Sequence, residues 1–68
     1  MNHFYHVVLK CESTIVDECD FDSVSSLYTY LVSYFKDNRE IHLYIYTRDI
    51  ITKSDTLYYS GLLKAVFA

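Results

Sequence analysis

The chain has no proline and no tryptophan, and Gly61 is the only glycine among its 68 residues. Average usage is about 7% glycine and about 5% proline, so Asp, Asn, Ser, Thr and Lys must make the turns here. We therefore expect no tight two-residue hairpins with positive φ. The scarcity of glycine also excludes phosphate-binding loops, because several closely spaced glycines are needed for backbone N–H groups to approach a phosphate.

Reactive and metal-binding side chains are few. Cys11 and Cys19 are too few for a disulfide scaffold, and we expect two free, half-buried thiols. Their separation does not fit the compact ligand pairs of zinc sites, and His3 and His6 should point to opposite faces of a strand. Neither cysteine lies in a glycine-containing turn of the kind that exposes a catalytic nucleophile. We predict a non-enzymatic protein with no metal site and no cofactor.

Long apolar runs are also missing. No stretch approaches the ~20 apolar residues that cross a bilayer, and the N-terminus lacks the basic leader and apolar core of a signal peptide. These features predict a cytoplasmic protein without a membrane partner.

The charge is acidic and uneven. The net charge is −3; residues 1–38 carry two lysines against six carboxylates, a balance of −4, whereas residues 39–68 carry four cations against three carboxylates, a balance of +1. Direct nucleic-acid binding is not favoured, because nucleic-acid binders typically carry a strongly basic surface.

Apolar periodicity predicts one helix and several strands. Residues 3–11 alternate as a central strand, and residues 14–16 suggest a short edge strand or an extended loop. A helix of about four turns should begin after an N-cap at Asp22 and end near Asp37-Asn38. Its apolar stripe comprises Val24, Leu27, Tyr28, Leu31, Val32 and Phe35.

The alternation of aliphatic side chains with other side chains is clearest in residues 40–48. Ile41, Leu43 and Ile45 should pack on the helix, leaving the other face free. Residues 56–60 should form a hairpin with this strand, and residues 61–68, which fit both helical spacing and alternation, are favoured as a strand. The fold class is α+β: a single domain over residues 1–68, with a small antiparallel or mixed sheet of three to four strands, one amphipathic helix on one face and the order β(β)αββ.

Two groups of residues are candidates for partner contacts. The first is acidic, and it surrounds one apolar residue. Such carboxylates can imitate nucleic-acid phosphates and dock into a basic cleft, although acids also simply cap the start of a helix. The group comprises Asp17, Glu18, Asp20, Phe21 and Asp22.

The second group lies on the outward face of the 40–48 strand and contains His42, Tyr44, Tyr46 and Arg48. Tyr58 or Tyr59 should lie across from them. Tyrosine and arginine are enriched in interface hot spots. The same face could instead form the interface of a homodimer, or stack the bases of a single-stranded nucleic acid.

In its size, acidic-aromatic surface and lack of motifs, the chain resembles small inhibitors of bacteriophages and other mobile elements, among them anti-CRISPR and DNA-mimic proteins. The resemblance is one of general character and aligns no residues. It implies an inhibitor that occupies the basic surface of a nucleic-acid-handling protein. The alternatives are a homodimeric structural subunit and a single-strand nucleic-acid binder.

Overall fold

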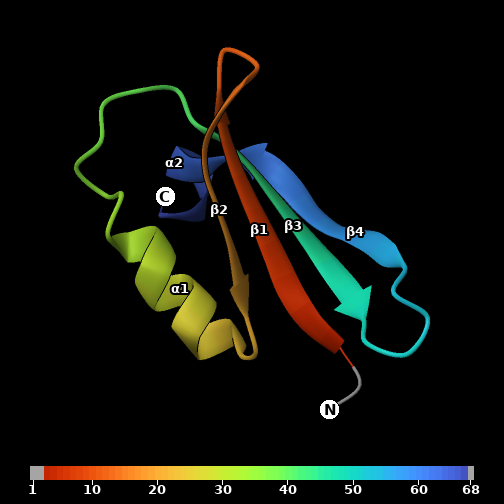
Figure 1. Cartoon of the computed structure of the whole chain (residues 1–68). Coiled ribbons are helices and arrows are strands. Elements are labelled where there is room, and N and C mark those ends of the chain that lie inside the picture. The colour runs from red at the N-terminus through yellow and green to blue at the C-terminus, as the bar shows by residue number, and fades with distance from the viewer. Residues whose placement is uncertain (1–2, 68) are drawn as a thin grey trace.

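A computed structural model of the chain describes residues 3–67, which form one four-stranded antiparallel sheet with the strand order β2-β1-β3-β4 and two helices (Figure 1). The fold class predicted from the sequence is thus confirmed, although the strand and helix bounds differ from the predicted ones. In chain order the elements are β1 (His3–Cys11), β2 (Thr14–Phe21), α1 (Val24–Val32), β3 (His42–Asp49), β4 (Asp55–Leu62) and α2 (Leu63–Val66).

The two central strands, β1 and β3, give the sheet its two unlike faces. Val7 pairs with Ile45 and Leu9 with Leu43, so these aliphatic side chains share one face. There they join Leu27 and Leu31 of α1 and Leu63 of α2 in the buried core. Ile41, Leu43 and Ile45 are all buried. The prediction that this stretch packs its aliphatic face against the helix is therefore confirmed.

The first helix is shorter than predicted. Its N-cap is Ser23, not Asp22: Ser23 is extended, and its Oγ accepts a hydrogen bond of 3.2 Å from the Ser26 N–H. The helix ends at Val32, because the Ser33 N–H and Oγ both donate to the Tyr30 carbonyl and the chain then continues in turns with i→i−3 bonds.

The second and fourth strands are longer than predicted. β2 continues through Asp17, Glu18 and Asp20 to Phe21, with an irregular register that leaves Val16 without a partner between Ile15 and Asp17. β4 ends at Leu62, and residues 63–66 form a short helix instead of the predicted strand. The reason is the length of β3: Leu62 already pairs with its first residue, His42, so no strand remains for the later residues to join. Residue 68 lies outside the described residues.

The β1–β2 connection contradicts our expectation about hairpins. Glu12 and Ser13 form a two-residue turn, with φ of 51° and 69°. Positive φ at both central positions is typical of a type I′ turn, which matches the twist of the flanking strands. A non-glycine residue in this region costs roughly 1–2 kcal/mol, so the packing of β1 against β2 must offset that cost.

Replacement of this turn by Glu12→Asn/Ser13→Gly should stabilise the protein by about 1–2 kcal/mol, because Asn-Gly adopts positive φ at little cost. For a chain of this size each kcal/mol raises the melting temperature by about 4–8 °C. Thermal unfolding followed by circular dichroism measures the effect. An unchanged or lower melting temperature would show that the turn is not under conformational strain.

Candidate functional site

The sheet face opposite the helices is covered by nothing in residues 3–67, and we call it the open face. Both helices pack on the other face, where Leu27, Leu31 and Leu63 enter the core. Strand alternation places on the open face Phe4, His6, Val8 and Lys10 of β1, Ile15, Glu18 and Asp20 of β2, His42, Tyr44, Tyr46 and Arg48 of β3, and Asp55, Leu57, Ser60 and Leu62 of β4.

His6 stands at the centre of the first cluster on the open face. Its Nε2 lies 2.8 Å from Oε1 of Glu18 and its Nδ1 lies 2.5 Å from Oδ1 of Asp20. Both contacts are hydrogen bonds to carboxylates when the imidazole carries two N–H groups. The His6 ring also lies 6.3 Å from that of Tyr46. The imidazole thus lies between two half-exposed carboxylates and next to the Tyr46 ring.

Two cation–aromatic contacts flank this cluster. Arg48 binds Asp55 through Nε at 2.6 Å and Nη2 at 2.8 Å, and its guanidinium lies 5.7 Å from the centre of the Phe4 ring. The ion pair lowers the pKa of the Asp55 carboxyl. On the other side of His6, Nζ of Lys10 lies 5.5 Å from the centre of the Tyr44 ring. The aromatic rings are thus held in place by charged neighbours.

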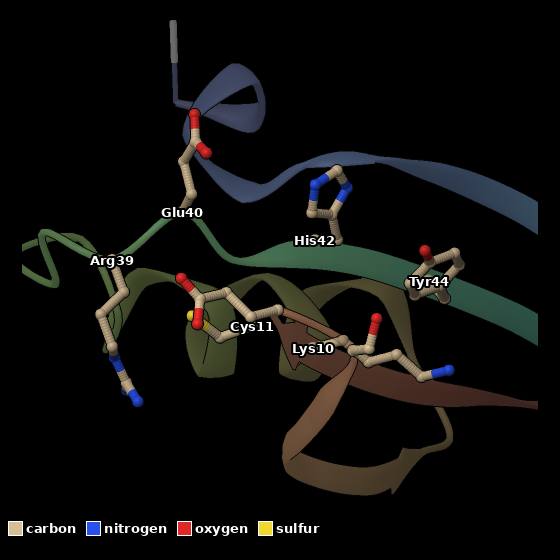
Figure 2. Close-up of a pocket in the computed structure, with 8 residues that line it drawn as sticks. Lys10, Cys11, Arg39, Glu40, His42 and Tyr44 are labelled. Carbon is tan, nitrogen blue, oxygen red and sulfur yellow. The ribbon is translucent and has the colours of Figure 1, made fainter.

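A polar hollow of about 500 Å³ continues the open face toward the β1–β2 turn. Figure 2 shows Lys10 of β1 and His42 and Tyr44 of β3 at its wall, whereas Arg39 extends away from them. Arg39 is held by Asp37 through a bond of 2.7 Å, which lowers the pKa of that carboxyl to about 2. The hollow therefore adds polar contact area next to Tyr44.

The structure does not bring the five residues of the acidic group together. Asp17 points to the helix side, where its Oδ2 accepts hydrogen bonds from the Tyr30 hydroxyl at 2.6 Å and the Tyr34 hydroxyl at 3.1 Å. Its Oδ1 accepts the Glu18 N–H at 2.9 Å. These bonds, led by that of Tyr30, lower the pKa of Asp17, while burial and the hydrogen bond to Asp17 raise the pKa of Tyr30. Asp17 thus fastens α1 to β2.

Phe21 is also separated from the carboxylates. It packs against the core, with its ring 5.0 Å from that of Tyr30, and so does not stand free among the acids as an apolar anchor. Asp22 is exposed in the connection to α1. The alternation of β2 explains the separation: Asp17, Cys19 and Phe21 face the helix, whereas Glu18 and Asp20 face outward.

The tyrosines of β4 do not join the open face. Leu57 pairs with Tyr46 and Ser60 with Tyr44, so the expectation that Tyr58 or Tyr59 lies across from them is wrong. An irregularity of register between Ile45 and Tyr46 turns Tyr58 to the helix side, where its ring lies 5.8 Å from that of Tyr5.

The sequence analysis missed the contribution of β1 to the open face, above all Phe4, His6 and Lys10. The alternation of residues 3–11 places them on one face together, but it does not say which strand lies beside them. Only the antiparallel register, in which His6 lies between Asp20 and Tyr46, reveals the cluster.

Cys11 and Cys19 are free and half-buried, as predicted. Within residues 3–67 no group of three or more His, Cys, Asp or Glu side chains is arranged to hold a metal ion, and none of the helices described has the length and apolar character needed to cross a membrane. The chain matches no protein-family model, no curated protein and no solved structure.

Proposed function

We propose that the protein is a small non-enzymatic binding module whose open face contacts another protein. The observation that carries this proposal is that the sheet has one face covered by two helices and another, lined with tyrosine, histidine and arginine, that nothing in residues 3–67 covers. Tyr44 and Tyr46 are only half-buried and present broad rings with a polar tip. The Tyr44 ring lies beside Lys10 and the Tyr46 ring beside His6, and side chains that are ordered before binding lose less entropy on binding.

The acidic side of this face points to a basic partner. Glu18 and Asp20 lie at one edge of the sheet with about half of each side chain exposed, and Asp22 follows at the end of β2. The His6 ring lies within hydrogen-bonding distance of the first two. Acids placed in this way suit a cleft lined with lysine and arginine and speed the encounter with such a partner.

The most concrete form of the proposal is an inhibitor of phage or mobile-element type, acting in the host cytoplasm. It would occupy the basic channel of a nucleic-acid-handling protein, as anti-CRISPR and DNA-mimic proteins do. Base stacking on the same tyrosines is disfavoured, since Glu18 and Asp20 share the face and Arg48 is already paired with Asp55.

The test is inhibition of nucleic-acid cleavage by a panel of purified enzymes with basic clefts, RNA-guided nucleases among them. The wild-type chain should inhibit at least one member, and Glu18→Lys/Asp20→Lys should weaken that inhibition by about 100-fold or more, because like charges then face each other. Ser25→Lys/Thr29→Lys, which adds positive charge at exposed positions of α1 on the other side of the sheet, should weaken it much less.

Circular dichroism should first show that both variants are folded. Inhibition of no enzyme in the panel, or equal inhibition by wild type and Glu18→Lys/Asp20→Lys, would rule out the inhibitor. Retention of the wild-type chain on single-stranded DNA or RNA at ordinary salt would favour the stacking alternative instead.

A further inference from the structure

The outer edge of β4 is unusually well suited to pairing with another strand. β4 is the last strand of the sheet, so one side of its backbone is unpaired within the described part of the chain. Residues 56–62 carry no charge and no proline, and all of them except Gly61 are exposed. Natural proteins usually protect such an edge with charges, proline or a covering segment.

The opposite edge of the same sheet has that protection. β2 places the carboxylates Asp17, Glu18 and Asp20 along its length, whereas each edge strand has one irregularity of register, at Val16 in β2 and at Tyr58 in β4. The charges of β2 discourage another strand from pairing with it. The contrast between the two edges indicates that β4, and not β2, is available to a partner strand.

An apolar groove adjoins β4 on the helix side of the sheet. Figure 1 shows α1 on the β2 side of the molecule and β4 on the other. Between them lies a cavity of about 260 Å³, with Val24 and Tyr28 on the wall formed by α1 and Tyr58 and Tyr59 on the wall formed by β4. The Tyr59 ring lies along β4, with its hydroxyl 3.1 Å from the position that a Cβ would take at Gly61.

The exposed area fits an interface between two proteins. Six large side chains of the edge and the groove are each between 37% and 63% exposed: Val24, Tyr28, Leu57, Tyr58, Tyr59 and Leu62. Together they equal about three fully exposed side chains, on the order of 600 Å² at roughly 200 Å² each. A standard interface buries roughly 800 Å² per partner, and the backbone edge with Thr56 and Ser60 adds to the side-chain area.

We propose that this edge and groove bind a second copy of the chain, with β4 of one copy antiparallel to β4 of the other. The charge distribution favours a second copy. Pairing through β4 keeps the acidic β2 edges at the two far ends of the assembly. Antiparallel pairing also keeps the two Asp55 residues apart and brings each toward the end of the other strand, which leads into Lys64.

The symmetry of this pairing completes the groove. Identical edges that pair antiparallel are related by a two-fold axis perpendicular to the sheet, so the helices of both copies lie on the same side. The two grooves then meet between the two α1 helices, and the Tyr58 and Tyr59 rings of both copies fill them. The product is a continuous sheet of eight strands, four from each copy, which presents two open faces in the same direction.

Sedimentation velocity of the full chain tests the dimer, and the result does not depend on what the open face binds. The wild type should sediment as a dimer of the 8.1 kDa chain at about 100 µM. Tyr58→Lys and Leu57→Lys, each at an exposed position of β4, should raise the dissociation constant by at least about 100-fold. Ile15→Lys places the same charge at an exposed position of β2 and should leave the dimer intact.

Hydrogen exchange of the β4 amides locates the contact. The amides of β4 that point away from β3 should be protected in the wild type and exchange fast in the two β4 variants. A monomeric wild type, a dimer that only Ile15→Lys or Tyr44→Ala/Tyr46→Ala disrupts, or a dimer with unprotected β4 amides would each overturn the proposal. The inhibition assay is read separately, so failure of the dimer and failure of the inhibitor are distinguishable.

Discussion

Leu43→Ala is expected to remove about half of the stability of the fold. Leu43 is 0% exposed at the centre of β3, where it pairs with Leu9 and lies in one cluster with Leu31. Truncation of a fully buried leucine costs about 2–5 kcal/mol, because the surrounding side chains fill the cavity only in part. A domain of this length is stable by roughly 3–10 kcal/mol. The variant should therefore lose about half of the free energy of unfolding of the wild type.

Urea unfolding followed by circular dichroism measures the loss. Ile51→Ala is a matched control: it truncates an aliphatic side chain that is 74% exposed in the β3–β4 turn, and its effect should be within about 0.5 kcal/mol. A Leu43→Ala variant that loses less than about 1 kcal/mol would contradict the single thin core described above.

Tyr44→Ala/Tyr46→Ala is expected to have the largest effect on binding while the fold survives. Both rings lie on the open face, away from the core. Interface hot spots of tyrosine lose about 2 kcal/mol or more each on truncation to alanine. For the two together we expect an affinity for the inhibited enzyme that is lower by about 100-fold or more, measured by isothermal titration calorimetry.

The control for this pair is Phe35→Ala, which removes an exposed aromatic ring beyond the end of α1. Its affinity should equal that of the wild type, because nothing near it belongs to the open face. Equal affinities of the wild type and Tyr44→Ala/Tyr46→Ala would show that the partner meets another surface. The acidic edge could then still be tested by its own charge-reversal variant.

The two central strands could be predicted because their pattern has a single physical cause. A strand buried on one face needs aliphatic residues at every second position, and Leu43 and Ile45 in β3 satisfy that need without ambiguity. The same reasoning identified β1 with its observed bounds. The open face of β3, with Tyr44 and Tyr46, follows directly from the alternation.

The rest of the site depends on register, which the sequence does not encode locally. The acidic residues of β2 are neighbours in the chain, yet the pleat sends Asp17 to the Tyr30 and Tyr34 hydroxyls and Glu18 to His6. The irregular register of β4 turns Tyr58 away from the open face in the same way. Both outcomes are set by pairing partners far away in the sequence.

Nuclear Overhauser contacts from the Tyr44 and Tyr46 rings in the wild-type chain test the two-faced sheet most directly. The Tyr44 ring should show contacts to the Lys10 side chain and the Tyr46 ring to the His6 ring. Neither ring should contact the methyl groups of Leu27 or Leu31, which lie in the core beneath α1. Contacts from either tyrosine to those leucines would place it under the helix and remove the surface on which binding is proposed.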